Sequence, residues 1–361
     1  MFESISPPTR PNWVLRIVIL ALTVAVATGF VSLWRMTQMP LSPYEGPLPP
    51  LTEVQSEVAS RLSGHVRYLS ATIGERNVHS AGSFEAITDY LEQNLVHAGY
   101  TVTEQPYRVE GHVVANFEAQ LLGSEKSEAA VVVGSHDDSV GGTVGANDNA
   151  SGVAATLELA RLLKGNKLRR TVRFVFFVNE EPRYFQTEQM GSLVYAHQLR
   201  RDGIPVAAMI SLETIGFYSD ARGSQKYPAL VSLFYPSRGN FIAFVGNDES
   251  RDLVRRAVRR FRESARFPSE GIAGPPDFAG RRLVGSLVVL AGRISGHHDH
   301  RHGSVSLSVL SHRSRHGGQS GFRKDGASGG RSSECGRFAL GRALNLRPWA
   351  LSVTLKWVHA N

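Results

Sequence analysis

Three apolar runs in the middle of the chain each lead into acidic or histidine side chains. The runs and the side chains that follow them are residues 131–133 with His136, Asp137 and Asp138, residues 172–178 with Glu180 and Glu181, and residues 207–212 with Glu213. A further polar element, residues 145–149 with Asp148, follows the first run. Short apolar runs are typical of buried parallel strands, whose carboxyl ends share one edge of a sheet. We therefore expect these side chains to meet at that edge, which indicates a metal-dependent hydrolase.

The chain between residues 52 and 265 alternates between helical and strand periodicity. Helical spacing predicts helices over residues 52–73, 83–98, 150–163, 190–201 and 251–265. Strand patterns cover residues 100–107, 113–122, 130–134, 171–178, 207–212 and 241–245. This alternation predicts an α/β fold with a mostly parallel twisted sheet and helices on both faces. A chain of 361 residues is long enough for one sizeable domain of this kind with appendages.

The N-terminal region contains an apolar stretch at residues 17–34, which we interpret as a single transmembrane helix. About 20 apolar residues are needed to span a bilayer, so this stretch is at the short end of that range. Arg10 and Arg16 precede it and Arg35 follows it. The two preceding basic residues favour a cytoplasmic N-terminus, with the rest of the chain on the exported, periplasmic or extracellular side.

A cleaved signal peptide is the alternative, with the small residues Ala25 and Ala27 near the cleavage site. Both interpretations export the domain that follows. Residues 36–50 contain five prolines and predict a linker. The predicted organisation is a cytoplasmic N-terminus and anchor at 1–35, a linker at 36–50, a catalytic domain at 51–280 and a basic tail at 281–361.

The positive charge of the chain is concentrated in that tail. Residues 281–361 hold 13 Lys or Arg and 3 acidic residues, leaving 27 and 29 of the chain totals of 40 and 32 for the rest. The predicted domain is therefore nearly neutral, and we expect no nucleic-acid partner. The single cysteine, Cys335, also lies in the tail, which excludes an intramolecular disulfide and a cysteine metal site.

The clustered acids and histidine indicate zinc. A group of carboxylates and one imidazole resists burial unless cations neutralise it, and imidazole with carboxylates and no thiolate suits a catalytic zinc site. Glu180 and Glu181 are adjacent, so their side chains point in different directions. One can bind metal while the other acts as general base. Asp138 stands two residues after His136 and can orient its imidazole.

These motifs resemble the M28 family of zinc metallopeptidases, whose best-known members are two-zinc aminopeptidases. The segments that carry the resemblance are residues 74–77, Gln105, residues 136–138, residues 147–152, residues 179–181 and residues 211–213. The resemblance weakens after about residue 275. It implies a peptidase that removes residues from the N-termini of peptides or proteins. Together with the apolar N-terminal stretch, this predicts an exported, membrane-anchored aminopeptidase. A glutaminyl-cyclase-like acyltransferase and a non-catalytic binding protein are the alternatives.

Carried over by position, the resemblance implies that Asp148 bridges two zinc ions. His136 and Glu213 would complete one site, and Glu181 would bind the other ion. Glu180 would take the proton of the attacking water as general base. Glu213 stands where many members of the family have aspartate, and its longer side chain can still bind metal.

Structural roles are expected for the remaining polar residues near these motifs. We expect Asp137 and Glu158 to face solvent. Asn147 and Asn149 either contribute to the site or only shape a turn.

The family has a further histidine ligand near its C-terminal end, for which this chain has no clear counterpart. The residues of a histidine-rich cluster that can replace it are His297, His298, Asp299, His300 and His302. We favour the hypothesis that the tail is a frameshifted translation. When residues 281–291, 294–303 and 308–312 are back-translated and the codons are read one base later, three sequences that resemble motifs of the family become possible. They occur in the order of the family, and they include the missing histidine. The second zinc site is then incomplete.

Overall fold

The computed structural model describes residues 12–80, 82–125, 129–227, 230–275 and 305–308. Its centre is one eight-stranded sheet with the strand order β1-β2-β4-β3-β5-β8-β6-β7. The strands are β1 Val102–Val109, β2 His112–Leu121, β3 Ala130–His136, β4 Val172–Phe177, β5 Val206–Glu213, β6 Ile242–Asn247, β7 Ser269–Gly274 and β8 Val305–Ser308. The helical elements are α1 Asn12–Thr37, α2 Glu53–Arg67, η1 Tyr68–Ile73, α3 Ser83–His97, α4 Ala150–Leu163, α5 Gly191–Arg201, η2 Val231–Leu233 and α6 Arg251–Ser264.

The centre of the sheet is parallel and its flanks are mixed. Strand β3 pairs in parallel with β4 and β5, and β5 pairs in parallel with β8. Strands β1 and β2 continue the sheet antiparallel beyond β4, whereas β6 is antiparallel to β8 and parallel to β7. The predicted parallel arrangement therefore holds for the strands that carry the apolar runs.

Helices cover both faces of the sheet, as predicted. Val131 and Val133 of β3 join the core that contains the buried residues of α4 and α6. Val132, between them, joins a second core with Tyr195 and Leu199 of α5. Successive strand residues point to opposite faces, so a continuous apolar run is what a strand covered on both sides requires.

The predicted helices and strands agree with the structure to within a few residues, and two strands were not predicted. β7 contains Gly271, Gly274 and Glu270, which break the apolar alternation that marks a strand. β8 belongs to the range assigned to the basic tail, yet its backbone pairs with β5 and β6 inside the sheet. The cluster from His297 to His302, Cys335 and most of the sequence considered for a frameshift lie outside the described residues.

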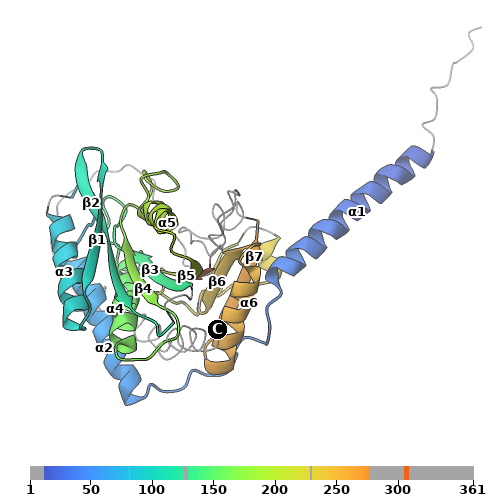
Figure 1. The fold of residues 1–361 in the computed structure, drawn as a ribbon. Coiled ribbons are helices and arrows are strands. Elements are labelled where there is room, and N and C mark those ends of the chain that lie inside the picture. The colour runs from blue at the N-terminus through green and yellow to red at the C-terminus, as the bar shows by residue number, and fades with distance from the viewer. Residues whose placement is uncertain (1–11, 81, 126–128, 228–229, 276–304, 309–361) are drawn as a thin grey trace, which may run out of the picture.

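Helix α1 projects away from the domain (Figure 1). Its segment Trp13–Thr37 is long and apolar enough to cross a membrane, and none of its most apolar window is buried. The chain that follows stays close to the domain, because Arg255 and Arg262 of α6 donate hydrogen bonds to the carbonyl oxygens of Gln38 and Pro40. The beginning of the predicted linker is therefore held against α6.

Candidate metal centre

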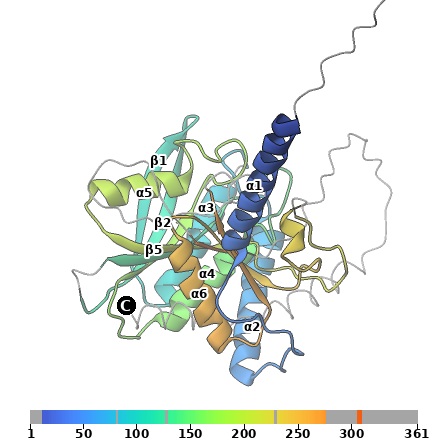
Figure 2. The ribbon, with the colours of Figure 1, turned by 90° about the vertical axis from the view of Figure 1, so that its right-hand side faces the viewer.

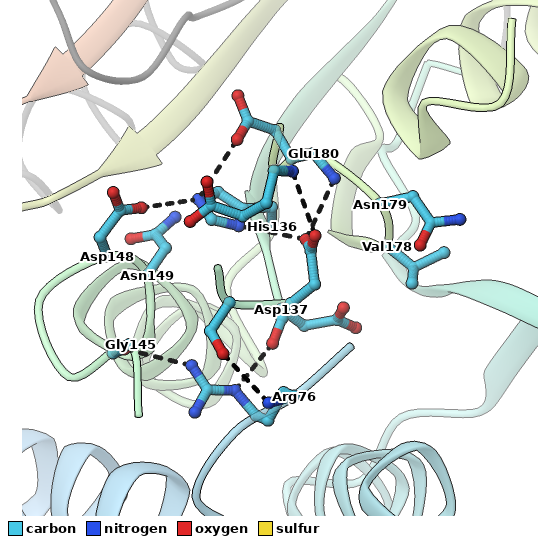
Figure 3. Close-up of polar contacts among 12 residues, drawn as sticks. Arg76, His136, Asp137, Gly145, Asp148, Asn149, Val178, Asn179 and Glu180 are labelled. Carbon is cyan, nitrogen blue, oxygen red and sulfur yellow. Dashed lines mark hydrogen bonds and ion pairs between the residues drawn. The ribbon is translucent and has the colours of Figure 1, made fainter. Parts of the chain in front are cut away.

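The candidate site lies at the carboxyl edge of the three central strands. His136 is the last residue of β3 and Glu213 is the last residue of β5. Glu180 follows β4, which lies beside β3 on the other side. Asp148 comes from the loop before α4 and points at His136 (Figure 3). The parallel pairing of the three strands brings residues that are far apart in sequence to one place.

His136, Asp148 and Glu213 form a compact group of possible metal ligands. Nε2 of His136 lies 3.1 Å from Oδ1 of Asp148 and 3.3 Å from Oε2 of Glu213. The three ligand atoms lie within 4.8 Å of one another. Oε2 of Glu180 is 3.8 Å from the same imidazole nitrogen. Four of the six residues predicted for the site therefore converge on one point.

These separations fit a zinc ion. Ligands at the usual 2.0–2.1 Å from a tetrahedral zinc ion lie about 3.3–3.4 Å from one another, close to the separations seen around His136. One imidazole and two carboxylates leave a fourth position for water or substrate. The donor set and the two separations from His136 therefore match a catalytic zinc site.

Burial makes the group of charges unfavourable without a cation. His136 and Glu213 are 2% and 1% exposed, and Glu180 is 7% exposed. Burial raises the pKa of Glu213 to about 7 and raises that of Glu180 well above its usual range. Burial lowers the pKa of His136, but the charges of Glu213 and Glu180 outweigh this effect and the net shift is upward. Glu213, Glu180 and His136 thus hold their protons more tightly than usual. A metal ion that bound to these side chains would displace the protons.

Asp138 contacts three other parts of the site. Its Oδ1 lies 3.2 Å from Nδ1 of His136. The other ring nitrogen, Nε2, faces Asp148 and Glu213. Its two carboxylate oxygens accept the backbone N–H groups of Glu180 and Glu181, each at 3.1 Å. An acceptor at Nδ1 keeps the proton there and leaves Nε2 free to bind a cation.

Asn149 holds both Glu213 and the start of α4. Its Nδ2 donates to Oε2 of Glu213 at 3.0 Å and to the carbonyl oxygen of Leu212 at 2.9 Å. Its Oδ1 accepts the backbone N–H of Gly152 at 2.9 Å, as an N-cap does. The peptide bond between Asp148 and Asn149 is cis. Asn149 therefore does more than shape a turn. Asn147 accepts the backbone N–H of Gly216 at 2.8 Å.

Glu181 lies beside the group but outside it. The ligand set that the described residues form contains His136, Asp148 and Glu213. Glu181 is 7% exposed, and its charge acts on both Glu180 and Arg76, so it faces the same interior region.

Arg76 supports the loop beneath the site and was not identified as a site residue from the sequence. The residue is 1% exposed. Figure 3 shows its guanidinium group beside the loop that contains Gly145. The guanidinium group donates to the carbonyl oxygens of Leu69, Gly74, Asp137, Val144 and Gly145. Its backbone N–H donates to Oγ of Ser139. The family resemblance includes residues 74–77 and therefore pointed to this segment. The sequence around a single arginine does not show that its side chain binds five backbone carbonyl oxygens.

The expectation that Asp137 and Glu158 face solvent was wrong. Asp137 is 2% exposed, and burial, followed by the charge of Asp138, raises its pKa well above the usual range. Glu158 is 3% exposed because α2 packs over α4 and brings His65 within 3.5 Å. Arg161 lies 2.8 Å from Glu158 on the other side. The helical pattern of α4 alone did not indicate that α2 covers this face.

Comparison with known proteins relates part of the domain to a peptidase family. The sequence profile of Peptidase family M28 matches residues 116–272. The chain is 38% identical to YfbL of Escherichia coli over 204 residues, which cover 54% of this chain and 62% of YfbL. It is 34% identical to Leupeptin-inactivating enzyme 1 of Streptomyces exfoliatus over 134 residues, or 37% of this chain and 29% of that enzyme. The chain therefore spans less than two thirds of each of these relatives.

Solved structures share the fold of this chain. The crystal structure of LapB from Legionella pneumophila matches with a TM-score of 0.55 and 16% identity, covering 90% of this chain and 79% of LapB. At this level of identity the likeness shows the fold alone.

Proposed function

We propose, given that residues 116–272 match the profile of Peptidase family M28, that this chain is an exported, membrane-anchored zinc aminopeptidase. Its substrates are the N-termini of peptides or proteins. The observation that carries the proposal is the position of Glu180. Its carboxylate lies 3.8 Å from Nε2 of His136, beside the group of possible ligands, and its Oε1 has no hydrogen-bond partner within the described part of the chain.

His136, Asp148 and Glu213 are the residues we assign to hold the first zinc ion. Glu181 and Asp148 are assigned to a second ion, whose site is incomplete if the tail is a frameshifted translation. A bound zinc ion supplies a Lewis acid and lowers the pKa of water in its coordination sphere. The carboxylates bring negative charge that two cations would balance, which supports the assignment of a site with more than one ion.

Glu180 is assigned as general base because it is poised to accept a proton. A buried carboxylate oxygen without a partner is costly, and a water molecule or substrate that donates a hydrogen bond to it removes this cost. Burial raises its pKa, which makes the carboxylate a stronger base for the proton that it takes from water and returns to the leaving amine. Asp138 positions the peptide segment that carries Glu180 by accepting its backbone N–H.

The proposal is tested by incubating the purified full-length chain, loaded with zinc in detergent, with a set of short peptides. Mass spectrometry of the products separates the candidate activities. Release of the first residue supports an aminopeptidase. Loss of ammonia from peptides that begin with glutamine, with the chain length unchanged, indicates the cyclase. Intact peptides in the presence of stoichiometric zinc indicate the non-catalytic alternative and overturn the proposal.

Anchoring through α1 is the second part of the proposal. The apolar length of Trp13–Thr37 and its lack of burial support a helix that crosses a bilayer. Carbonate extraction of membranes from cells that express the chain tests it, because a spanning helix stays in the pellet. N-terminal sequencing of the extracted chain distinguishes the anchor from a cleaved signal peptide.

A further inference from the structure

The end of α1 is packed against the domain rather than joined to it by a free linker. Leu33 and Met36 contact the apolar cluster of the η2, β6 and β7 region. The buried members of that cluster are Val231, Phe241, Ala243, Val245 and Ile272. Met39, just after the helix, lies 2.8 Å from where a Cβ on Gly271 would be, so β7 and the chain after α1 are in close contact. The direction in which α1 leaves the domain is therefore fixed (Figure 2).

A contact closer to the N-terminus of α1 brings a loop of the domain beside the apolar part of the helix. The rings of Phe30 and Phe234 lie 5.9 Å apart. Phe30 precedes Thr37, the last residue of α1, by seven positions, which at a rise of 1.5 Å per residue is about 10 Å along the axis. If the apolar length of α1 lies in the hydrocarbon region of a bilayer, Phe234 therefore lies at the edge of that region as well.

The short helix η2 next to Phe234 is apolar on both sides. Val231 is 1% exposed and anchors it to the cluster beneath. Leu230 and Leu233 are 68% and 72% exposed. Residues three apart in a 3₁₀ turn lie on one side, so these two leucines form a single outward-facing apolar surface.

The residues around this surface are those typical of a membrane boundary. Trp34, near the end of α1, is 48% exposed. Tyr227 and Tyr235 flank η2 and stack on each other with ring centroids 5.5 Å apart. Tryptophan and tyrosine are enriched where a membrane protein passes from hydrocarbon to water.

We propose that Leu230, Leu233 and Phe234 insert into the lipid bilayer beside α1 and hold the domain against the membrane surface. The proposal rests on the anchoring role of α1 given above. Lipid is the occupant that the geometry favours, because the exposed leucines are continuous with the apolar surface of a helix that is itself long enough to span a bilayer. The membrane contact then comprises a spanning helix and a second, shallow contact through η2.

Three single-cysteine variants of the full chain test this, each made in a Cys335→Ser background and labelled with an environment-sensitive fluorophore. Leu233→Cys reports on η2. Val24→Cys, 56% exposed in the middle of α1, reports on the anchor. Leu122→Cys, 70% exposed just after β2, towards the other end of the sheet from β6 and β7, is the matched control. The labelled chains are reconstituted into phosphatidylcholine and phosphatidylglycerol vesicles with or without brominated acyl chains.

The expected result is quenching by brominated lipid at positions 24 and 233 and none at position 122. Quenching at position 24 alone overturns the contact through η2 and leaves the anchor intact. Absence of quenching at both positions 24 and 233 removes the anchor as well. The fluorophore at position 233 can instead show a blue-shifted emission that is not quenched by brominated lipid and that depends on protein concentration. This result means that a second copy covers the leucines, and it also overturns the proposal. Leu230→Cys repeats the measurement in case the label at position 233 perturbs η2.

Discussion

The carboxylate of Asp138 lies 3.2 Å from Nδ1 of His136, while Nε2 of the same ring faces the group of possible ligands. An acceptor on one side of an imidazole fixes both the tautomer and the orientation of the ring, and outer partners of this kind typically change metal affinity 10–100-fold. We predict that Asp138→Ala weakens zinc binding by about that factor. Competition with a chromophoric chelator measures it, and the exposed Asp202→Asn is the control. Unchanged affinity would contradict the role of Asp138.

Glu180→Gln is expected to separate chemistry from metal binding. The amide keeps the shape of the side chain but cannot take a proton, so kcat should fall by about 10²–10⁴-fold. Zinc content, measured by elemental analysis, should stay the same because Glu180 is not among the assigned ligands. Glu188→Gln, at a side chain that is 84% exposed, should leave both values unchanged. Loss of zinc in Glu180→Gln would make this residue a ligand instead of a base.

Asn149→Ala should destabilise the domain by about 1–3 kcal/mol. The substitution removes the N-cap of α4 and leaves buried groups of Leu212 and Glu213 without their donor. Thermal unfolding of the full chain in detergent gives the change. Asn166→Ala is a matched control, since Asn166 is exposed and donates to carbonyl oxygens at the other end of the same helix. An equal decrease in unfolding temperature in both variants would contradict the role of Asn149 as N-cap and as donor to Leu212 and Glu213.

Arg76→Lys should be costly although the charge is kept. A lysine has one ammonium group and cannot satisfy five backbone carbonyls at once, so we expect a loss of about 2–4 kcal/mol. The loop that holds Asp138 would also loosen, and zinc affinity should fall in parallel. Arg183→Lys, at a side chain that is 61% exposed, should unfold at the wild-type temperature.

Removal of zinc should destabilise the protein more as pH rises. The folded pKa of Glu213 is about 7, above its ordinary value of 4.5, so in the metal-free protein the stability due to its protonated form is present below pH 4.5 and is lost as pH rises through about 7. The raised pKa of His136 acts in the same direction. The difference in unfolding temperature between zinc-loaded and metal-free protein should therefore widen from pH 5.5 to pH 8. A constant difference would argue that these groups do not bind the ion.

The positions of His136 and Glu213 could be predicted from the sequence because continuous apolar runs identify buried parallel strands and hence a common edge. Asp148 followed from the family resemblance, since nothing in its loop fixes its direction locally. β7 was missed because Gly271 and Glu270 interrupt its apolar pattern.

Packing between elements accounts for the other errors. Glu158 lies on the face of α4 that α2 covers, and Asp137 lies in the loop that Arg76 fills from below. The contact of the chain after α1 with α6 depends on Arg255 and Arg262, whose basic pattern in the sequence resembles that of a solvent-facing helix. A pattern read along one element does not reveal which other element covers it.

The three assigned ligands of the first ion stand at positions 136, 148 and 213, on strands and a loop that come together only when the sheet has formed. No short stretch of the newly made chain contains them all. A polypeptide that crosses a membrane unfolded therefore carries no assembled binding site with it. Under the proposed topology, the protein must take its metal from the compartment in which it folds, and zinc supply outside the cytoplasm sets how much of it becomes active.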